Sequence, residues 1–232
     1  MRLRFAGIDR AEAAVDQWAD EVWLAAPAEA AAFAHGRWVP NDTCAPAAPE
    51  PLPEGPGRLL FVGNRRYPPN RDGLGWFLAE VWPLLRREQP ELTLEVVGHG
   101  PHLALAGVVS AGFLPDVNPA YRRCHLVVAP LRFGSGTPLK ILEALGRGRA
   151  VVATPAAARG IVGHPDALRL ADTPAAFAAA VRKLLANPAA LGDLGRAAHA
   201  WARREADWYR IMSGAVAQSL AAARTRPAAK AP

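Results

Sequence analysis

From residue 58 onward, short apolar runs alternate with segments in which apolar residues recur every three or four positions. The runs RLLFVG (58–63), LTLEVVG (92–98), HLVVAP (125–130) and AVVAT (150–154) have the length of buried strands. The segment 71–89 between the first two has helical spacing. Apolar strands interleaved with amphipathic helices indicate a parallel sheet covered on both faces. The chain is therefore predicted to be an α/β protein with a doubly wound parallel sheet.

The stretch CAPAAPEPLPEGPG (44–57) directly precedes this pattern. Its prolines and glycines exclude a helix or strand interior, so we predict a semi-rigid linker at 44–57. Residues 1–43 repeat the α/β pattern in miniature, as a short N-terminal remnant that is too small to close a core. We expect its large aromatic side chains to pack against the C-terminal helices or a partner chain: Trp18, Trp23, Phe33 and Trp38. The main α/β domain is assigned to 58–190, and C-terminal helices with a frayed tail, PAAKAP, to 191–232.

The net charge of +6 comes mostly from arginine pairs that are spread along the chain. We expect no nucleic-acid partner, and an anionic small ligand fits the same charge. The two cysteines, Cys44 and Cys124, lie in unrelated segments, which argues against a disulfide framework or a zinc site. No apolar run approaches the roughly 20 residues that span a bilayer, and MRLR is not followed by a signal sequence. We expect a cytoplasmic protein with at most peripheral membrane contact.

The segment FGSGTPLKILEAL (133–145) places a glycine loop directly before a helix. Thr137 is a favourable N-cap and Pro138 suits the first helical position. Because the strand at 125–130 ends just before the loop, the loop lies at the carboxyl edge of the sheet, where ligands bind. A phosphate is expected to meet the helix N-terminus and the amides of the loop residues Gly134, Ser135, Gly136 and Thr137. The alternative is a plain turn that needs glycine for its backbone angles.

The helix after this loop carries candidate binding side chains on one face. Lys140 lies within one turn of the expected phosphate, and Glu143, one turn further on, is placed for a sugar hydroxyl. The alternative is a surface salt bridge between the two, worth about 0.5 kcal/mol. Apolar residues are expected to face the sheet: Leu139, Leu142 and Leu145.

Two further turns at strand ends offer weaker candidates. Gly63 allows a sharp turn after the first strand, and Arg65 and Arg66 would then project over the same sheet edge as phosphate ligands. His99 lies in the glycine turn VGHGP but has no partner at catalytic spacing. The sequence has no catalytic-triad signature, no metal-ligand spacing and no P-loop. The catalytic residues stay unassigned, and any chemistry would depend on positioning and electrostatics.

Several segments, in this order and spacing, resemble a known family over roughly 58–212: LLFVGNRRYPPNRDGLGWFL, LEVVGHGP, VVSAGFLPDV, HLVVAPLRFGSGTPLKILEALGRGRAVVATPAAARGI and DWYRI. They resemble the C-terminal donor-binding domain of retaining glycosyltransferases with the GT-B fold, the glycosyl transferases group 1 class. The resemblance implies a UDP- or GDP-sugar donor and no metal cofactor. It implies that Glu143 binds ribose, that the amides at 134–137 hold the diphosphate or donor sugar, and that the backbone of Gly112, Phe113 and Leu114 flanks the base.

The sequence departs from the family pattern in three ways. Ser135 stands where the family commonly has the first glutamate of its E-x7-E pattern, and the basic pair after the first strand is replaced by Asn64 and Pro69. Residues 1–43 look like the last elements of an otherwise missing acceptor domain. One hypothesis is an enzyme whose acceptor site comes from a separate chain, a homodimer or residues 1–43. The others are a non-catalytic nucleotide-sugar-binding module, or a fragment of a longer enzyme.

Overall fold

The computed structural model describes residues 6–43, 45–134, 136–205 and 207–225. Within it the chain divides into a larger unit, 42–207, and a smaller unit that joins the N-terminal 41 residues to the segment from Trp208 onward. Four sequence features lie outside the described residues, namely the MRLR start, Cys44, Ser135 and the PAAKAP tail. The expected C-terminal segment 191–232 is thus shared between the two units.

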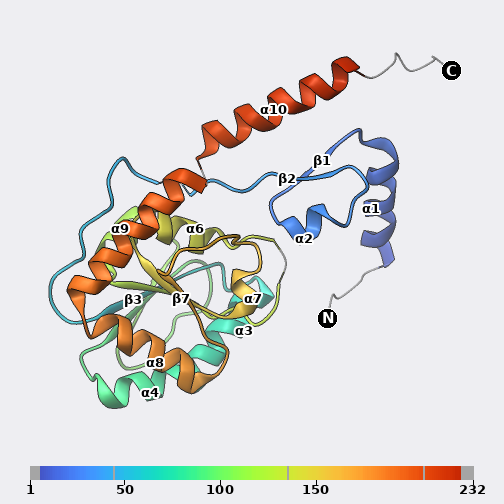
Figure 1. The fold of residues 1–232 in the computed structure, drawn as a ribbon. Coiled ribbons are helices and arrows are strands. Elements are labelled where there is room, and N and C mark those ends of the chain that lie inside the picture. The colour runs from blue at the N-terminus through green and yellow to red at the C-terminus, as the bar shows by residue number, and fades with distance from the viewer. Residues whose placement is uncertain (1–5, 44, 135, 206, 226–232) are drawn as a thin grey trace. The chain divides into compact units, whose positions relative to one another are not determined.

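The larger unit contains a six-stranded parallel sheet in the order β5-β4-β3-β6-β7-β8 (Figure 1). Its strands are β3 (Arg58–Val62), β4 (Thr93–Val97), β5 (Val108–Gly112), β6 (Leu126–Ala129), β7 (Ala150–Ala153) and β8 (Leu168–Leu170). Every residue of the central strands β6 and β7 is buried, as is expected for a parallel sheet covered on both faces. The predicted doubly wound α/β fold is confirmed.

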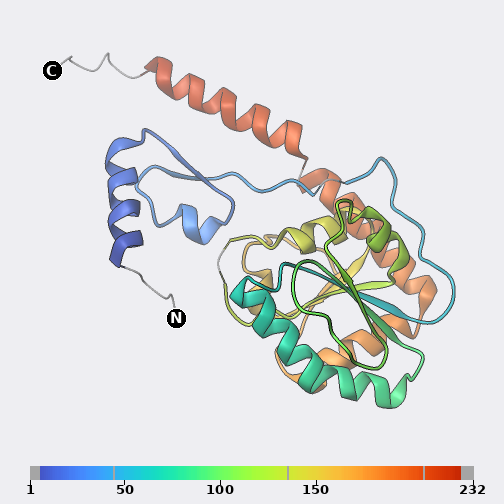
Figure 2. The same cartoon turned by 180° about the vertical axis from the view of Figure 1, so that it is seen from behind.

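Helices cover both faces of this sheet (Figures 1 and 2). One face carries α3 (Pro68–Trp76), the π-helical segment η1 (Phe77–Val81), α4 (Trp82–Glu88) and α8 (Pro174–Leu185). The other face carries α5 (Asn118–Arg123) and α6 (Leu139–Gly146), with α9 (Pro188–Glu205) packed on α6. A short helix, α7 (Pro155–Ala158), follows β7. Phe177 of α8 joins the first layer by edge-to-face contacts with Trp76 and Phe77.

The segment 71–89, predicted as one helix, is interrupted by the π-helical turn η1. Pro83 explains the interruption, since it has no backbone N–H for the helical ladder and its ring clashes with the carbonyl one turn earlier. The wider π turn immediately before Pro83 removes this conflict and lets the chain continue as α4.

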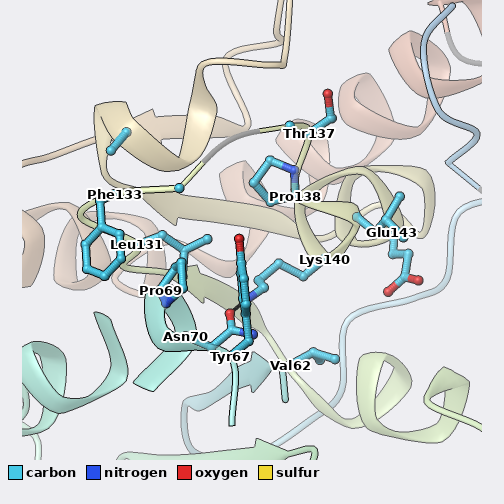
Figure 3. Close-up of a pocket in the computed structure, with 15 residues that line it drawn as sticks. Val62, Tyr67, Pro69, Asn70, Leu131, Phe133, Thr137, Pro138, Lys140 and Glu143 are labelled. Atoms are coloured by element: carbon cyan, nitrogen blue, oxygen red, sulfur yellow. Dashed lines mark hydrogen bonds between the residues drawn. The ribbon is translucent and has the colours of Figure 1, made fainter. Parts of the chain in front are cut away.

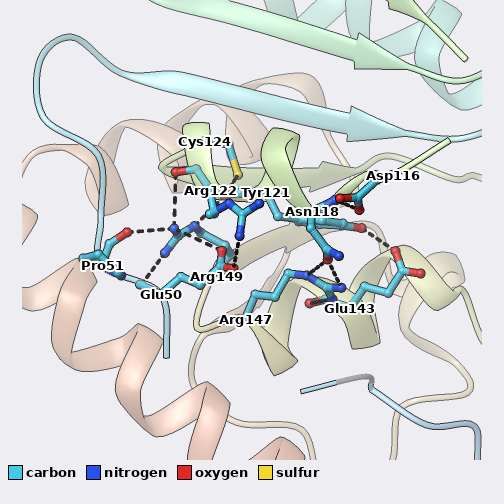
Figure 4. Close-up of polar contacts among 10 residues, drawn as sticks. All are labelled: Glu50, Pro51, Asp116, Asn118, Tyr121, Arg122, Cys124, Glu143, Arg147 and Arg149. Atoms are coloured by element: carbon cyan, nitrogen blue, oxygen red, sulfur yellow. Dashed lines mark hydrogen bonds and ion pairs between the residues drawn. The ribbon is translucent and has the colours of Figure 1, made fainter. Parts of the chain in front are cut away.

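Residues 45–57 contain no helix or strand, yet hydrogen bonds hold them against the rest of the larger unit. Arg149, which is fully buried, donates hydrogen bonds to the carbonyl oxygens of Glu50 and Pro51, each at 2.8 Å (Figure 4). Nε2 of His199 lies 2.8 Å from the carbonyl oxygen of Pro46. The predicted linker is therefore a strap attached along its length, because prolines leave carbonyl acceptors without their own donors.

The smaller unit contains a two-stranded parallel sheet of β1 (Val22–Leu24) and β2 (Gly36–Trp38). Its helices are α1 (Ala6–Trp18), α2 (Pro27–Ala30) and α10 (Trp208–Thr225). Arg37 of β2 forms an ion pair with Glu21 and donates a hydrogen bond to Gln218 of α10 at 2.8 Å. Ser219 of α10 also donates to Glu21. Polar contacts therefore attach the last helix to this N-terminal sheet.

Within the smaller unit, the expected burial of the N-terminal tryptophans against its C-terminal helix α10 is wrong. Trp18 is 88% exposed, and Trp38 and Trp23 are 40% and 36% exposed. The contacts of α10 with Arg37 and Glu21 are polar and involve its Gln218 and Ser219 side chains. Burial against a partner chain stays a prediction. None of the described helices is both long and apolar enough to span a membrane.

Candidate functional site

A cavity of about 350 Å³ lies at the carboxyl ends of β3 and β6 (Figure 3). These strands are neighbours, but the chain leaves β3 toward β4 on one side and leaves β6 toward β7 on the other. Such a switch point is where open parallel sheets bind ligands. The cavity is lined by Val62, Gly63, Tyr67, Pro69, Asn70, Leu131, Phe133, Gly134, Gly136, Thr137, Pro138, Leu139, Lys140, Glu143 and Ala156.

Helix α6 begins one residue later than predicted. Pro138 takes the N-cap position with extended angles, φ −67° and ψ 108°, so the first helical residue is Leu139. The predicted N-cap Thr137 was wrong; its hydroxyl instead donates to the carbonyl oxygen of Gly160 at 3.3 Å. Leu139 is 52% exposed at the cavity rather than packed on the sheet, whereas Leu142 and Leu145 are buried as predicted.

The glycine loop needs its glycines for backbone geometry. Gly134 and Gly136 have φ values of +133° and +76°, in the region that side-chain-bearing residues avoid. A Cβ built on Gly136 would meet no described atom within 4 Å, so packing does not explain this glycine. The conformation keeps the backbone at the cavity wall bare, next to the first turn of α6.

Lys140 lies buried in the cavity wall and not on the surface. Its Nζ donates a 2.6 Å hydrogen bond to Oδ1 of Asn70 and lies 4.5 Å from the centre of the Phe61 ring. Burial lowers the pKa of this ammonium to about 7, although the negative charge of Glu143 opposes the fall. Among the described residues Lys140 has no ion pair within 4 Å, so the surface salt bridge with Glu143 is absent. The cation lacks a close carboxylate partner.

Asn70 connects three parts of the cavity. Besides accepting from Lys140, it donates from Nδ2 to the carbonyl oxygen of Asn64 at 3.0 Å. A Cβ on Gly63 would lie 2.8 Å from the Asn70 side chain, so only glycine leaves room for this amide. The loop after β3 and the first turn of α6 are thereby held in register through one side chain.

Glu143 lines the same cavity one turn further along α6. Its Oε2 accepts a 2.7 Å hydrogen bond from the hydroxyl of Tyr121, a fully buried residue on α5. Burial, together with the Glu143 charge, raises the pKa of this phenol well above its usual value, so the phenol stays a donor. The Glu143 carboxylate therefore has a fixed hydrogen-bond donor on its buried side.

The two arginines after β3 differ from each other. Arg66 is exposed, whereas Arg65 is 5% exposed and donates to the carbonyl oxygen of Pro101. Its Nε and Nη2 are buried and have no hydrogen-bond partner among the described residues. Burial lowers the pKa of this guanidinium. The expectation that Arg65 projects over the edge was wrong, because its side chain packs on the turn at Gly100.

The candidates after β4 and β5 form a separate group at the same edge of the sheet. The rings of His99 and Phe113 are stacked, with centroids 4.7 Å apart and planes 7° apart. Phe113 is 59% exposed, Leu114 is half-buried and Gly112 has a φ of +71°. None of these residues lines the cavity at β3 and β6, so their part in binding stays a prediction.

The structure thus brings together one set of the predicted residues at the cavity: Gly63, Gly134, Gly136, Thr137, Lys140 and Glu143. Arg65, Arg66 and the His99 group lie outside its lining. Sequence reasoning missed Asn70 and Tyr121. A signal was present for Tyr121, since a tyrosine in an otherwise core-facing turn of helix requires a partner for its hydroxyl. Within the described part of the chain, no three His, Cys, Asp or Glu side chains are grouped to hold a metal.

Comparison with known proteins gives the class of protein to which this fold corresponds. The family model described as glycosyl transferases group 1 matches residues 56–187, which is more than half of the chain. The chain belongs to this family. The resemblance to GT-B glycosyltransferases is therefore confirmed at the level of family and fold.

Individual relatives are distant. A protein of Klebsiella pneumoniae, described as an uncharacterized 44.6 kDa protein in the cps region, is 24% identical over an alignment of 170 residues that covers 67% of this chain and 44% of the relative. Sucrose-phosphate synthase from Thermosynechococcus elongatus superposes with a TM-score of 0.75 at 20% identity, over 95% of this chain and 63% of that one. Anabaena HepE, in complex with UDP and glucose, gives a TM-score of 0.68 at 18% identity, over 93% and 67%. The chain thus spans about half to two thirds of these proteins.

Proposed function

We propose that this protein binds a nucleotide-diphosphate sugar in the cavity at β3 and β6, as the donor-binding part of a retaining glycosyltransferase. The observation that carries the proposal is the buried Lys140 ammonium, which has one neutral hydrogen-bond acceptor and no ion-paired carboxylate among the described residues. A buried cation without a counter-ion is costly, and a diphosphate bound beside it would supply the missing negative charge.

The surroundings of Lys140 support the same ligand. The first turn of α6 contributes backbone N–H groups and the positive end of the helix dipole, which favour phosphate. The bare backbone at Gly134 and Gly136 allows close approach. On this proposal Glu143 binds ribose hydroxyls, and the base lies along Gly112–Leu114, near the stacked rings of His99 and Phe113. UDP bound to Anabaena HepE, a structural neighbour, makes UDP a suitable first probe.

The transfer itself would depend on positioning. Lys140 and the helix end would stabilise the charge that develops on the leaving diphosphate, without a metal ion, which is how electrostatic preorganisation lowers a barrier. The general acid, base or nucleophile is not assigned. The acceptor site would come from a partner chain, a homodimer or residues 1–43.

The alternative is a nucleotide-sugar-binding module without turnover, or a part that needs an acceptor-domain partner. It is supported by the cavity, whose described lining offers binding contacts without an assigned general acid, base or nucleophile. The two functions differ in whether free sugar is released from the donor. A retaining enzyme should slowly release the α-anomer of the sugar from UDP-glucose, which NMR detects as the first product, whereas a binding module should leave the donor intact.

Calorimetry of the full chain with UDP, GDP, UDP-glucose, GDP-mannose and the nucleosides uridine and guanosine tests the proposal. We expect a diphosphate of one base to bind with a Kd below about 1 mM and at least tenfold more tightly than its nucleoside, since a charge-assisted hydrogen bond contributes about 1.5–3 kcal/mol. Absence of binding to every nucleotide at millimolar concentration would contradict it.

A further inference from the structure

Tyr121 has no assigned role in the proposed donor site, although it contacts Glu143 (Figure 4). Its ring is fully buried on α5, yet its hydroxyl reaches α6, where it lies 2.7 Å from Oε2 of Glu143 and 3.4 Å from the carbonyl oxygen of Lys140. A phenol has a single proton to donate. The shorter contact, to a charged acceptor, is the stronger one, so the proton points at the carboxylate.

The backbone and ring of Tyr121 are fixed independently of Glu143. The guanidinium of the buried Arg147 lies 4.9 Å from the ring centre, and the fully buried Arg149 donates from Nε to the Tyr121 carbonyl oxygen at 2.9 Å. Arg147 is fixed in turn, because its Nε donates to Oδ1 of Asn118 at 2.9 Å. The phenol is thus a rigid donor on a rigid support.

Arg147 also holds the backbone that carries Glu143. Its Nη1 donates to the Glu143 carbonyl oxygen at 3.0 Å, while the phenol of Tyr121 holds the carboxylate at Oε2. The other carboxylate oxygen, Oε1, accepts no hydrogen bond from the described residues, and Glu143 lines the cavity. A long, flexible side chain is therefore held at both ends with one acceptor oxygen available.

We propose that Tyr121 is a positioning residue that fixes the Glu143 carboxylate so that its remaining oxygen meets the ribose hydroxyls of the nucleotide, and thereby sets the preference for ribose over deoxyribose. This inference rests on the proposed function. Holding a side chain in its binding geometry before the ligand arrives lowers the ordering cost of binding, an effect of about threefold to tenfold in affinity.

The test compares UDP with 2′,3′-dideoxy-UDP, and GDP with 2′,3′-dideoxy-GDP, on the full chain by calorimetry. Tyr121→Phe removes only the hydroxyl and keeps the ring beneath Arg147. We expect the ribose preference to fall by about threefold or more, with the affinity for the dideoxy nucleotide unchanged within twofold. Adding Tyr121→Phe to Glu143→Ala should change the preference no further, because the phenol acts through the carboxylate. Trp82→Phe is the control: it removes a partly buried hydrogen bond from Trp82, at the start of α4, to the Ala106 carbonyl oxygen. Because α4 covers the opposite face of the sheet from α5, this variant should leave the preference intact.

A second measurement needs no variant at position 121. A buried phenol proton bonded to a carboxylate exchanges slowly and gives a downfield NMR signal, which should vanish in Glu143→Ala. We expect this signal to shift when UDP or GDP binds and to stay in place with the dideoxy nucleotide. A wild-type ribose preference that Tyr121→Phe retains, or a signal indifferent to ribose, would overturn the role of Tyr121 and leave the proposed function standing. Failure of the wild-type chain to bind either nucleotide would overturn both.

Discussion

Burial of the Lys140 ammonium destabilises the folded protein, whereas the proposed binding of a diphosphate requires that buried charge. Below pH 7 both the folded and the unfolded chain carry its proton, so burial of the charged ammonium weakens the folded state by its full amount. Between pH 7 and the unfolded pKa of about 10.5 only the unfolded chain binds that proton, so the contribution of Lys140 to stability rises with pH. A side chain with this cost is retained where a ligand compensates for it.

Replacing this residue should separate stability from binding. Lys140→Met keeps the apolar stem and removes the charge, so we expect the melting temperature of the ligand-free protein at pH 7 to rise or stay unchanged. Affinity for UDP or GDP should fall by about 1.5–3 kcal/mol, while affinity for the nucleoside changes little. Lys183→Met, at an exposed position of α8, is the control for loss of a lysine charge. Undiminished diphosphate binding by folded Lys140→Met protein would remove Lys140 from the site.

The lowered pKa of Lys140 also predicts how binding depends on pH. UDP-glucose is the suitable ligand because both of its phosphates are esterified and keep a constant charge. With a Lys140 pKa of about 7, its affinity should decrease as pH rises from 7 to 9, by up to tenfold per pH unit, since only the ammonium form attracts the diphosphate. Calorimetric titrations at pH 6, 7, 8 and 9 measure the slope. A flat profile that is identical in Lys140→Met would mean that the ammonium does not contact the phosphates.

At the scale of the elements, the alternation of apolar strands and helices was sufficient to predict the sheet and its helical layers. Both faces of each central strand are buried, so each strand reads as an apolar run, and the spacing of apolar residues in each helix is visible within a short segment of sequence. Local pattern could not locate the start of α6 at Leu139, which depends on the extended angles of Pro138. It also could not pair Tyr121 with Glu143 or Lys140 with Asn70. These side chains lie 22 and 70 positions apart and meet only through packing of the helices and loops on the sheet.

The strap at 45–57 gives a prediction for one element. Arg149→Met would leave the carbonyl oxygens of Glu50, Pro51 and Tyr121 without this donor. Because buried acceptors that lose a charged donor are costly, we expect a decrease of about 3 kcal/mol in the free energy of unfolding and faster proteolysis within 45–57. Urea denaturation and limited proteolysis measure the two effects. Arg123→Met, which removes a surface ion pair with Glu95, should cost less than about 1 kcal/mol; equal losses in the two variants would show that the strap contributes nothing.

For the whole molecule, the exposed tryptophans of the smaller unit predict association. Trp18 and Trp38 present exposed apolar area on the smaller unit. We expect light scattering to detect a dimer or higher assembly as concentration rises, and the double variant Trp18→Gln, Trp38→Gln to shift it toward monomer without lowering the melting temperature. Leu105→Gln, at an exposed site of the larger unit, should have no effect. A monomer at all concentrations would restrict the partner to a different chain.

The division of the chain into units sets an order of events during its synthesis. The smaller unit is discontinuous: its strands β1 and β2 come first, but α10, which supplies contacts to Arg37 and Glu21, comes last. Residues 42–207 are continuous and can fold as soon as they leave the ribosome. At about 5–20 residues per second, β1 and β2 wait about 10–40 s for α10 to be completed. During that interval the two parallel strands and their tryptophans are open to chaperones or to another nascent chain of the same kind. A partner that completes the smaller unit therefore has its opportunity before α10 is made.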